Sequence, residues 1–567
     1  MKRVNGLEFV SLDGVIQAPG GPEEDNTKPP LWKSVVPAVL FIAGLFVSPA
    51  YAAPQSCEQL ARLALPHASI TSAQTIAAGA FTPPANATPW LVGDPAFYKR
   101  LPAFCRVSAV SKPSPDSEIK IEVWMPASGW NGKFRGQGNG GFAGEIDWRP
   151  LGLAIAQGYA SAATDTGHAA NAGEATWALG HPEKIVDFGY RAIHEMTAVG
   201  KATTKAFYGD TPKYTYFAAC SNGGRQALME AQRFPDDYDG ILAGAPANYW
   251  THLLTSVLWD AQATTLDANS YIPSSKIPAI AQAVVAACDA NDGLNDGILN
   301  DPRQCHFDPS TMLRKGADSD LCLTEPQAIA LKKLYQGATD SKGSQIFPGF
   351  MPGGEEGQGG WPLYITGPAP AKALLFVSDY GYFADMVYDK ADWDYKKANV
   401  DDALAASDKK FAGILNSTDT NLKPFQARGG KLIIYHGWSD AVISPLNSIN
   451  YYESVIQQMG KPGADSFLRL YMVPGMQHCF GGPGPDVFGE NGFSISNDPQ
   501  HNIYVALEQW VEKGTAPPSV IASKLEDVGA DAKVKLSRPL CPYPQQAQYK
   551  GSGDPNDGSN FTCETPK

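Results

Sequence analysis

The sequence contains no CxxC pair, no run of Lys or Arg, and no visible internal repeat. Without a CxxC pair, its nine cysteines favour disulfides over a metal-thiolate site. It has 45 basic and 58 acidic residues, a net charge of -13 and no basic cluster, so we expect no nucleic-acid partner. The missing repeat excludes a solenoid or propeller.

What is present describes an ordinary globular protein. Of its 567 residues 43% are hydrophobic, 10% aromatic and 18% charged, with no low-complexity bulk. This length allows several domains, or one enzyme fold with a large insertion.

A stretch near the N-terminus has the layout of a secretory signal. Lys33 precedes an apolar run over 35–47, and Ala50-Tyr51-Ala52 forms a small-x-small cleavage site. The alternative is a membrane anchor, but this run is shorter than the roughly 20 residues that a spanning helix needs. Because signals seldom follow a polar extension such as residues 1–30, we expect translation to start near Leu31. We therefore treat 1–52 as extension and signal, and expect a secreted or periplasmic protein without a stable membrane span.

Sequence spacing favours three local disulfides and one remote pair, with Cys322 left unpaired: Cys57–Cys105, Cys288–Cys305, Cys541–Cys563 and Cys220–Cys479. The remote pair would join "FAACSNGGRQ" (217–226) to "GMQHCFGG" (475–482).

Strands and helices alternate over residues 117–250, a pattern that predicts an α/β fold with a parallel sheet. The alternation stops after residue 250 and resumes near 429, with an aromatic and loop-rich stretch between. We predict a first core half at 53–250, an insertion at 251–425 and a second core half at 426–567.

Ser221 follows a predicted strand and precedes a predicted helix, which is the context of a nucleophile elbow. Asp440 and His478 follow two later strands, in the order Ser, Asp, His expected of an α/β-hydrolase. We predict Ser221 as nucleophile, His478 as base and Asp440 as the acid that orients it. For His168 and His436, also at strand ends, we expect structural roles.

An oxyanion would need backbone N–H donors. Asn222, at the start of the helix, is one candidate, and Gly140 in "GQGNGGFAG" (136–144) is the other, with Gly141 next. The alternative for this loop is a flexible glycine turn.

The segment "CDANDGLNDGILND" (288–301) concentrates oxygen ligands of the kind that Ca²⁺ prefers. Its spacing does not match an EF-hand, and a solvated acidic loop is an equally good interpretation. The candidate ligands are the carboxylates of Asp289, Asp292 and Asp296 and the carbonyls of Leu294 and Ile298.

Five motifs together resemble the tannase/feruloyl esterase family, which also includes mono(hydroxyethyl) terephthalate hydrolases: "CSNGGRQ", "GWSDAVISP", "QHCFGG", "CDANDGLNDGIL" and "DKADWDY". The resemblance spans residues 53–567 and implies an α/β-hydrolase core with a large inserted lid domain and a structural Ca²⁺. It further implies the same triad, calcium loop and Cys220–Cys479 bridge. One departure is Arg314, where many relatives have a second lid cysteine that would pair with Cys322.

We therefore expect an exported serine esterase that acts on a small ester of an aromatic acid, of feruloyl or galloyl type, through an acyl-enzyme. The alternatives are a terephthalate monoester hydrolase, a peptidase or lipase with the same triad, and a secreted binding protein without activity.

Overall fold

The computed structural model describes residues 54–490, 492, 494–527 and 532–566. The predicted extension and signal, residues 1–52, lie outside the described residues. No helix in the described part is both long and apolar enough to cross a membrane.

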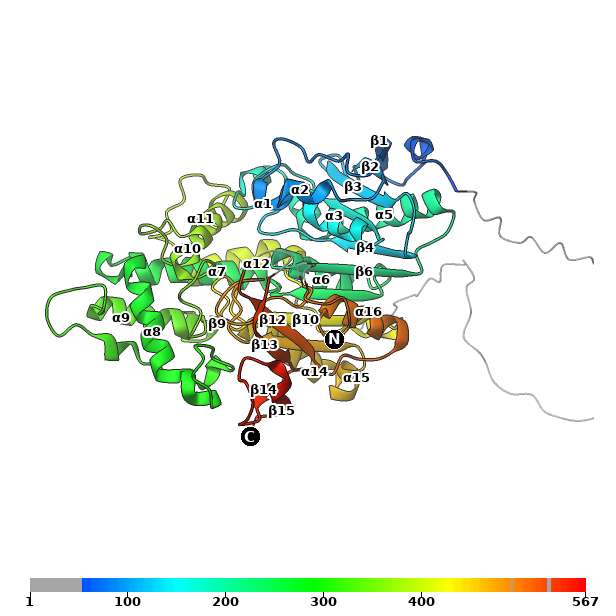
Figure 1. Ribbon diagram of the computed structural model, residues 1–567. Coiled ribbons are helices and arrows are strands. Elements are labelled where there is room, and N and C mark those ends of the chain that lie inside the picture. Colours follow the sequence, from blue (N-terminus) through cyan, green and yellow to red (C-terminus); the bar gives the residue numbers. More distant parts are fainter. Residues whose placement is uncertain (1–53, 491, 493, 528–531, 567) are drawn as a thin grey trace, which may run out of the picture. The chain divides into compact units, whose positions relative to one another are not determined.

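A nine-stranded sheet forms the centre of the fold, in the order β1-β2-β3-β5-β4-β6-β7-β10-β11 (Figure 1). From β5 to β11 neighbouring strands are parallel, which confirms the predicted parallel sheet. The first three strands add an antiparallel extension that the sequence pattern did not predict. The bounds are β1 (Ala68–Ile76), β2 (Phe104–Ser111), β3 (Ile119–Pro126), β4 (Lys133–Gln137), β5 (Ala160–Thr164), β6 (Tyr214–Cys220), β7 (Gly240–Gly244), β10 (Lys431–Gly437) and β11 (Leu468–Val473).

Helices cover both faces of this sheet. Successive side chains of a strand point to opposite sides, and here both sides carry apolar residues that pack against helices. Phe217 and Ile434 pack against one group of helices: α5 (Ala192–Tyr208), α6 (Asn222–Arg233) and α14 (Leu446–Met459). The adjacent Tyr216 and Ile433 pack on the other side against α3 (Trp148–Ala156) and α16 (Ile503–Lys513). These three layers are those of an α/β-hydrolase core.

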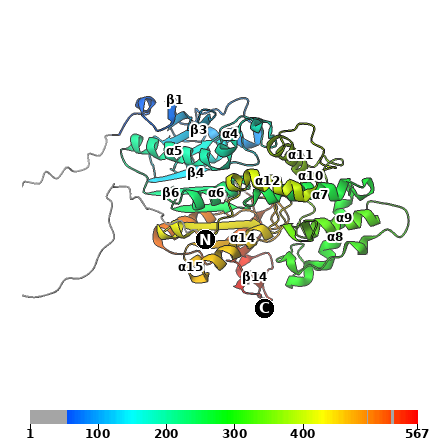
Figure 2. The same cartoon turned by 180° about the vertical axis from the view of Figure 1, so that it is seen from behind.

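The chain between β7 and β10 is mainly helical. Its elements are α7 (Trp250–Thr265), α8 (Ile277–Cys288), α9 (Glu325–Gln336), α10 (Trp361–Tyr364), α11 (Leu374–Gly381), α12 (Val400–Leu415) and α13 (Lys423–Ala427), with the hairpin β8 (Gly337–Thr339) and β9 (Gln345–Pro348). Figures 1 and 2 show α7 to α11 grouped at one end of the strands. Residues Tyr51–Lys567 form one compact unit. The division at 250 and 425 therefore stays a prediction.

Two small antiparallel pairs follow α16: β12 (Val520–Leu525) with β13 (Val534–Leu540), and β14 (Gln546–Tyr549) with β15 (Phe561–Glu564). Short helices in the first half are α1 (Pro89–Val92), α2 (Pro95–Tyr98) and α4 (Pro182–Val186), and α15 (Lys461–Asp465) precedes β11.

Candidate active site

Ser221 occupies a sharp turn between β6 and α6. Its backbone has φ 68° and ψ -125°, a conformation that costs a non-glycine residue about 1–3 kcal/mol. The Ser221 N–H donates to the carbonyl of Gly244 (2.9 Å), and its own carbonyl accepts from Ala247 (3.1 Å). The strained turn is thus held from both sides by the segment that follows β7.

Two glycines make room for Ala219, which stands where a G-x-S-x-G elbow has its first glycine. A Cβ added to Gly223 would lie 2.4 Å from the Ala219 Cβ, and one added to Gly138 would lie 2.6 Å from it. The glycine loop therefore packs directly on the start of α6. The N–H of Asn139 reinforces this contact by donating to Oε1 of Gln226 (2.9 Å).

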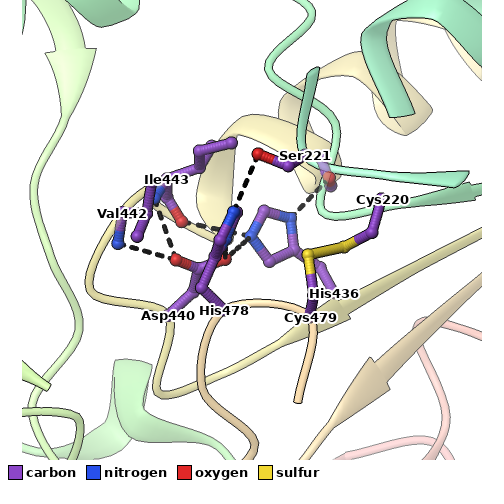
Figure 3. The surroundings of a disulfide bond; sticks show 9 residues. Cys220, Ser221, His436, Asp440, Val442, Ile443, His478 and Cys479 are labelled. Carbon is purple, nitrogen blue, oxygen red and sulfur yellow. Dashed lines mark hydrogen bonds and ion pairs between the residues drawn. A yellow bond between two sulfur atoms is a disulfide. The ribbon is translucent and has the colours of Figure 1, made fainter. Parts of the chain in front are cut away.

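The structure brings Ser221, His478 and Asp440 together in a chain of hydrogen bonds (Figure 3). Nε2 of His478 lies 2.9 Å from Ser221 Oγ, and Nδ1 lies 2.7 Å from Asp440 Oδ2. The Asp440 side chain is fully buried, while that of His478 is 12% exposed. This geometry allows the imidazole to accept a proton from the serine hydroxyl while the carboxylate orients the ring.

The Asp440 carboxylate accepts further hydrogen bonds. Its Oδ1 accepts from the backbone N–H groups of Val442 (2.7 Å) and Ile443 (2.9 Å). The ring of His436, for which the sequence suggested a structural role, contacts Oδ2 at 3.1 Å. Burial alone would raise the pKa of Asp440. The charge of His478 and the hydrogen bonds from both histidines outweigh burial, so the pKa lies below its ordinary value.

The Cys220–Cys479 disulfide joins the residue before Ser221 to the residue after His478, with a Cα–Cα distance of 6.0 Å (Figure 3). The three predicted local disulfides are also present. Cys322 is free, as predicted. Arg314 donates its backbone N–H to the carbonyl of Leu323, the residue after Cys322 (2.9 Å).

The oxyanion candidates lie on two adjoining elements. Asn222 is the first residue of α6, and Gly140 follows the loop residues that pack on α6. The Trp90 ring covers Gly140, since a Cβ there would lie 3.6 Å from Trp90 Cη2. Two large aromatic side chains near the candidate site are exposed: Trp90 (58%) and Phe480 (64%), which follows Cys479 in the chain. Neither aromatic side chain was selected from the sequence, because no motif marks it.

His168 supports the same glycine loop. Its Nε2 lies 2.8 Å from the carbonyl oxygen of Phe142, and its ring stacks on Trp177 with centroids 3.7 Å apart. Burial lowers the pKa of His168 to about 4, so the ring is neutral near pH 7. These contacts agree with the structural role predicted for it.

Arg225, in the "CSNGGRQ" motif, is fully buried and fixes the Asn222 side chain. Its Nε donates to Asn222 Oδ1 (2.8 Å), and its other nitrogens donate to the carbonyls of Phe188 (3.0 Å) and Gly189 (2.8 Å). Burial lowers the pKa of Arg225 to about 9. Sequence reasoning missed this residue, although its position four residues after Ser221 was a usable signal.

The five candidate calcium ligands share one loop after α8, closed by the Cys288–Cys305 disulfide: Asp289, Asp292, Leu294, Asp296 and Ile298. Burial raises the pKa of Asp292 to about 6, with smaller contributions from the charges of Asp296 and Asp289. Arg538 donates to Asp296 Oδ2 (2.6 Å). Among the described residues, His, Cys, Asp and Glu form no group of three arranged to hold a metal ion. The oxygen-only donor set of this loop, carbonyls included, still suits a hard cation.

The layered sheet and the serine elbow define an α/β-hydrolase. Residues 105–564 match the family described as tannase and feruloyl esterase, and the chain belongs to this family of ester hydrolases. An uncharacterized esterase of Xanthomonas campestris pv. campestris is 41% identical over 536 residues, covering 90% of this chain and 91% of the relative. A probable feruloyl esterase B-2 of Aspergillus terreus is 33% identical over 468 residues, covering 81% and 86%.

Solved structures give the same result. Feruloyl esterase B from Aspergillus oryzae superimposes with a TM-score of 0.81 at 30% identity, covering 91% of this chain and 100% of that one. Tannin acyl hydrolase from Aspergillus niger superimposes with a TM-score of 0.67 at 25% identity, covering 91% and 94%.

Proposed function

We propose that this ester hydrolase is an exported serine esterase that cleaves esters of aromatic acids, of feruloyl or galloyl type. The observation that carries this proposal is the hydrogen-bonded chain from Ser221 through His478 to Asp440. The relatives and solved structures described above include feruloyl esterases and a tannin acyl hydrolase, which supports an ester of an aromatic acid as substrate. The exposed Trp90 beside Gly140 supports a planar aromatic substrate.

In the first half-reaction, Ser221 Oγ attacks the ester carbonyl carbon while His478 Nε2 takes the hydroxyl proton. The backbone N–H groups of Asn222 and Gly140 stabilise the negative charge on the carbonyl oxygen. The ester C–O bond then breaks, and His478 gives its proton to the departing alcohol. Water attacks the acyl-enzyme in the same way, releasing the aromatic acid and restoring Ser221.

Export and calcium belong to the same proposal. The cleavable signal at 33–52 and four disulfides suit an oxidising compartment. We infer that the oxygen-rich loop after α8 holds a structural Ca²⁺ through the five ligands named above. In this role the ion stabilises the inserted region and takes no part in the chemistry. We propose that the inserted region acts as a lid.

The test is a substrate panel on purified enzyme: methyl gallate, methyl ferulate and a terephthalate monoester, each with wild type and Ser221→Ala. We expect hydrolysis of at least one of the first two, and loss of all activity in the variant without loss of fold. If Ser221→Ala retained a tenth of wild-type turnover, the proposed serine mechanism would be refuted. Preference for the terephthalate monoester would favour that alternative.

A further inference from the structure

A second histidine contacts the candidate catalytic acid. His436 is the second-to-last residue of β10, its ring is fully buried, and it faces the Asp440 carboxylate together with His478 (Figure 3). Its Nε2 lies 3.1 Å from both Asp440 Oδ2 and the carbonyl oxygen of Ile443. Because both of these atoms are acceptors, Nε2 must carry a hydrogen and act as the donor.

The contact completes the hydrogen bonding of Asp440. An ionised carboxylate has about four lone-pair positions. Oδ1 accepts two backbone N–H bonds, and Oδ2 accepts one bond from each histidine. All four positions are thus filled by protein groups around a side chain that solvent does not reach. Removing one donor would leave a buried anion with an unfilled position, which is costly in a protein interior.

We propose that His436 is a positioning residue that keeps Asp440 ionised and its Oδ2 directed at His478. This inference rests on the proposed triad and concerns a residue that does not touch the substrate. His436 and His478 bond to the same oxygen, so the donor on His436 draws negative charge from the atom that faces His478. It also restrains rotation of the carboxylate plane.

The surroundings of His436 hold its ring in this orientation. Nδ1 lies 2.7 Å from Ser448 Oγ on α14, and on β11 the residue paired with His436 is the uncharged Met472. The charged or titratable groups around the ring are Asp440 and, across that carboxylate, His478. Farther out, burial and then the charge of Asp440 raise the pKa of Tyr364 on α10.

The experiment compares His436→Phe with His436→Gln. The amide nitrogen of Gln is as many bonds from Cβ as Nε2 of His, so Gln retains a donor and Phe does not. For His436→Phe we expect kcat to fall about tenfold or more with KM nearly unchanged, since an orienting contact is lost. We also expect the acid limb of the kcat/KM profile to move up by roughly half a pH unit or more, because a more negative Oδ2 favours protonated His478.

His436→Gln should return the acid limb to its wild-type position and restore most of kcat. As a matched control, Ser448→Ala removes the bond at Nδ1 but leaves the Nε2 donor, and should leave the acid limb in place. If His436→Phe does not fold, His436→Asn replaces it. The Asn amide is too short to reach Asp440, so this variant should show the same shift of the acid limb.

The proposal is overturned if the acid limb does not move in the variants without a donor, or if Gln and Phe lose activity equally. Either result would mean that His436 only packs. Failure of the proposed function is recognised separately, because wild type would then show no hydrolysis that depends on Ser221.

Discussion

The Cys220–Cys479 disulfide makes the most direct prediction, since one covalent bond joins the neighbours of the candidate nucleophile and base. Changing both residues to alanine leaves Ser221 and His478 in the chain but removes the bond between their loops. The bridge spans 259 residues of sequence, for which chain entropy gives about 5.5 kcal/mol of stabilisation as an upper figure. We expect a lower free energy of unfolding and a turnover reduced at least tenfold, or about 1.4 kcal/mol of lost transition-state stabilisation.

Cys541→Ala/Cys563→Ala provides the matched control. That bridge joins no residue of the predicted triad. It spans 22 residues, for which chain entropy gives about 3.4 kcal/mol. The control should lose stability without losing turnover. The assays are denaturant unfolding and kcat on methyl ferulate, measured well below the melting temperature of each variant.

The reasoning fails if the Cys220/Cys479 double variant keeps full turnover, or if both variants lose turnover in proportion to stability. Free thiols at Cys220 and Cys479 in active wild-type enzyme, found by peptide mapping, would refute it directly.

The remaining predictions concern pH and metal. The pKa of His168 falls from 6.5 to about 4 on folding, so the unfolded chain binds more protons between these values and stability declines as pH falls through this window, by on the order of 3 kcal/mol. His168→Gln, which retains a donor for Phe142, should flatten this decline, and an unchanged slope would contradict the assignment. Chelation with EDTA should lower the melting temperature more than turnover on a small ester, and Asp292→Asn should lose this response. A melting temperature insensitive to both EDTA and added Ca²⁺ would leave the loop as a solvated turn.

Much of this architecture could be predicted from the sequence because its signals are local. The strand-serine-helix context of Ser221 depends on neighbouring residues, and the order of Asp440 and His478 follows from parallel strands ending at one edge of a sheet. The antiparallel pairing of β1, β2 and β3 was missed because the pattern of a strand does not reveal its partners. Pairing depends on which edge of the sheet remains available.

The missed site contacts are non-local. Arg225 bonds to carbonyls at 188 and 189, and Trp90 reaches Gly140 from a separate short helix. The contact between His436 and Asp440 spans only four residues, yet it depends on the turn after β10 folding the carboxylate back over the strand end. A sequence pattern specifies that a turn occurs there, but not where its side chains point.

The surroundings of Asp440 also set the pH range in which this carboxylate stabilises the fold. Its pKa is lower in the folded protein than in the unfolded chain, so the carboxylate contributes stability at pH values above its unfolded pKa. That contribution is lost only as pH falls through the depressed folded value. Asp440 therefore stays ionised in moderately acidic solution, and the carboxylate that orients His478 remains charged there.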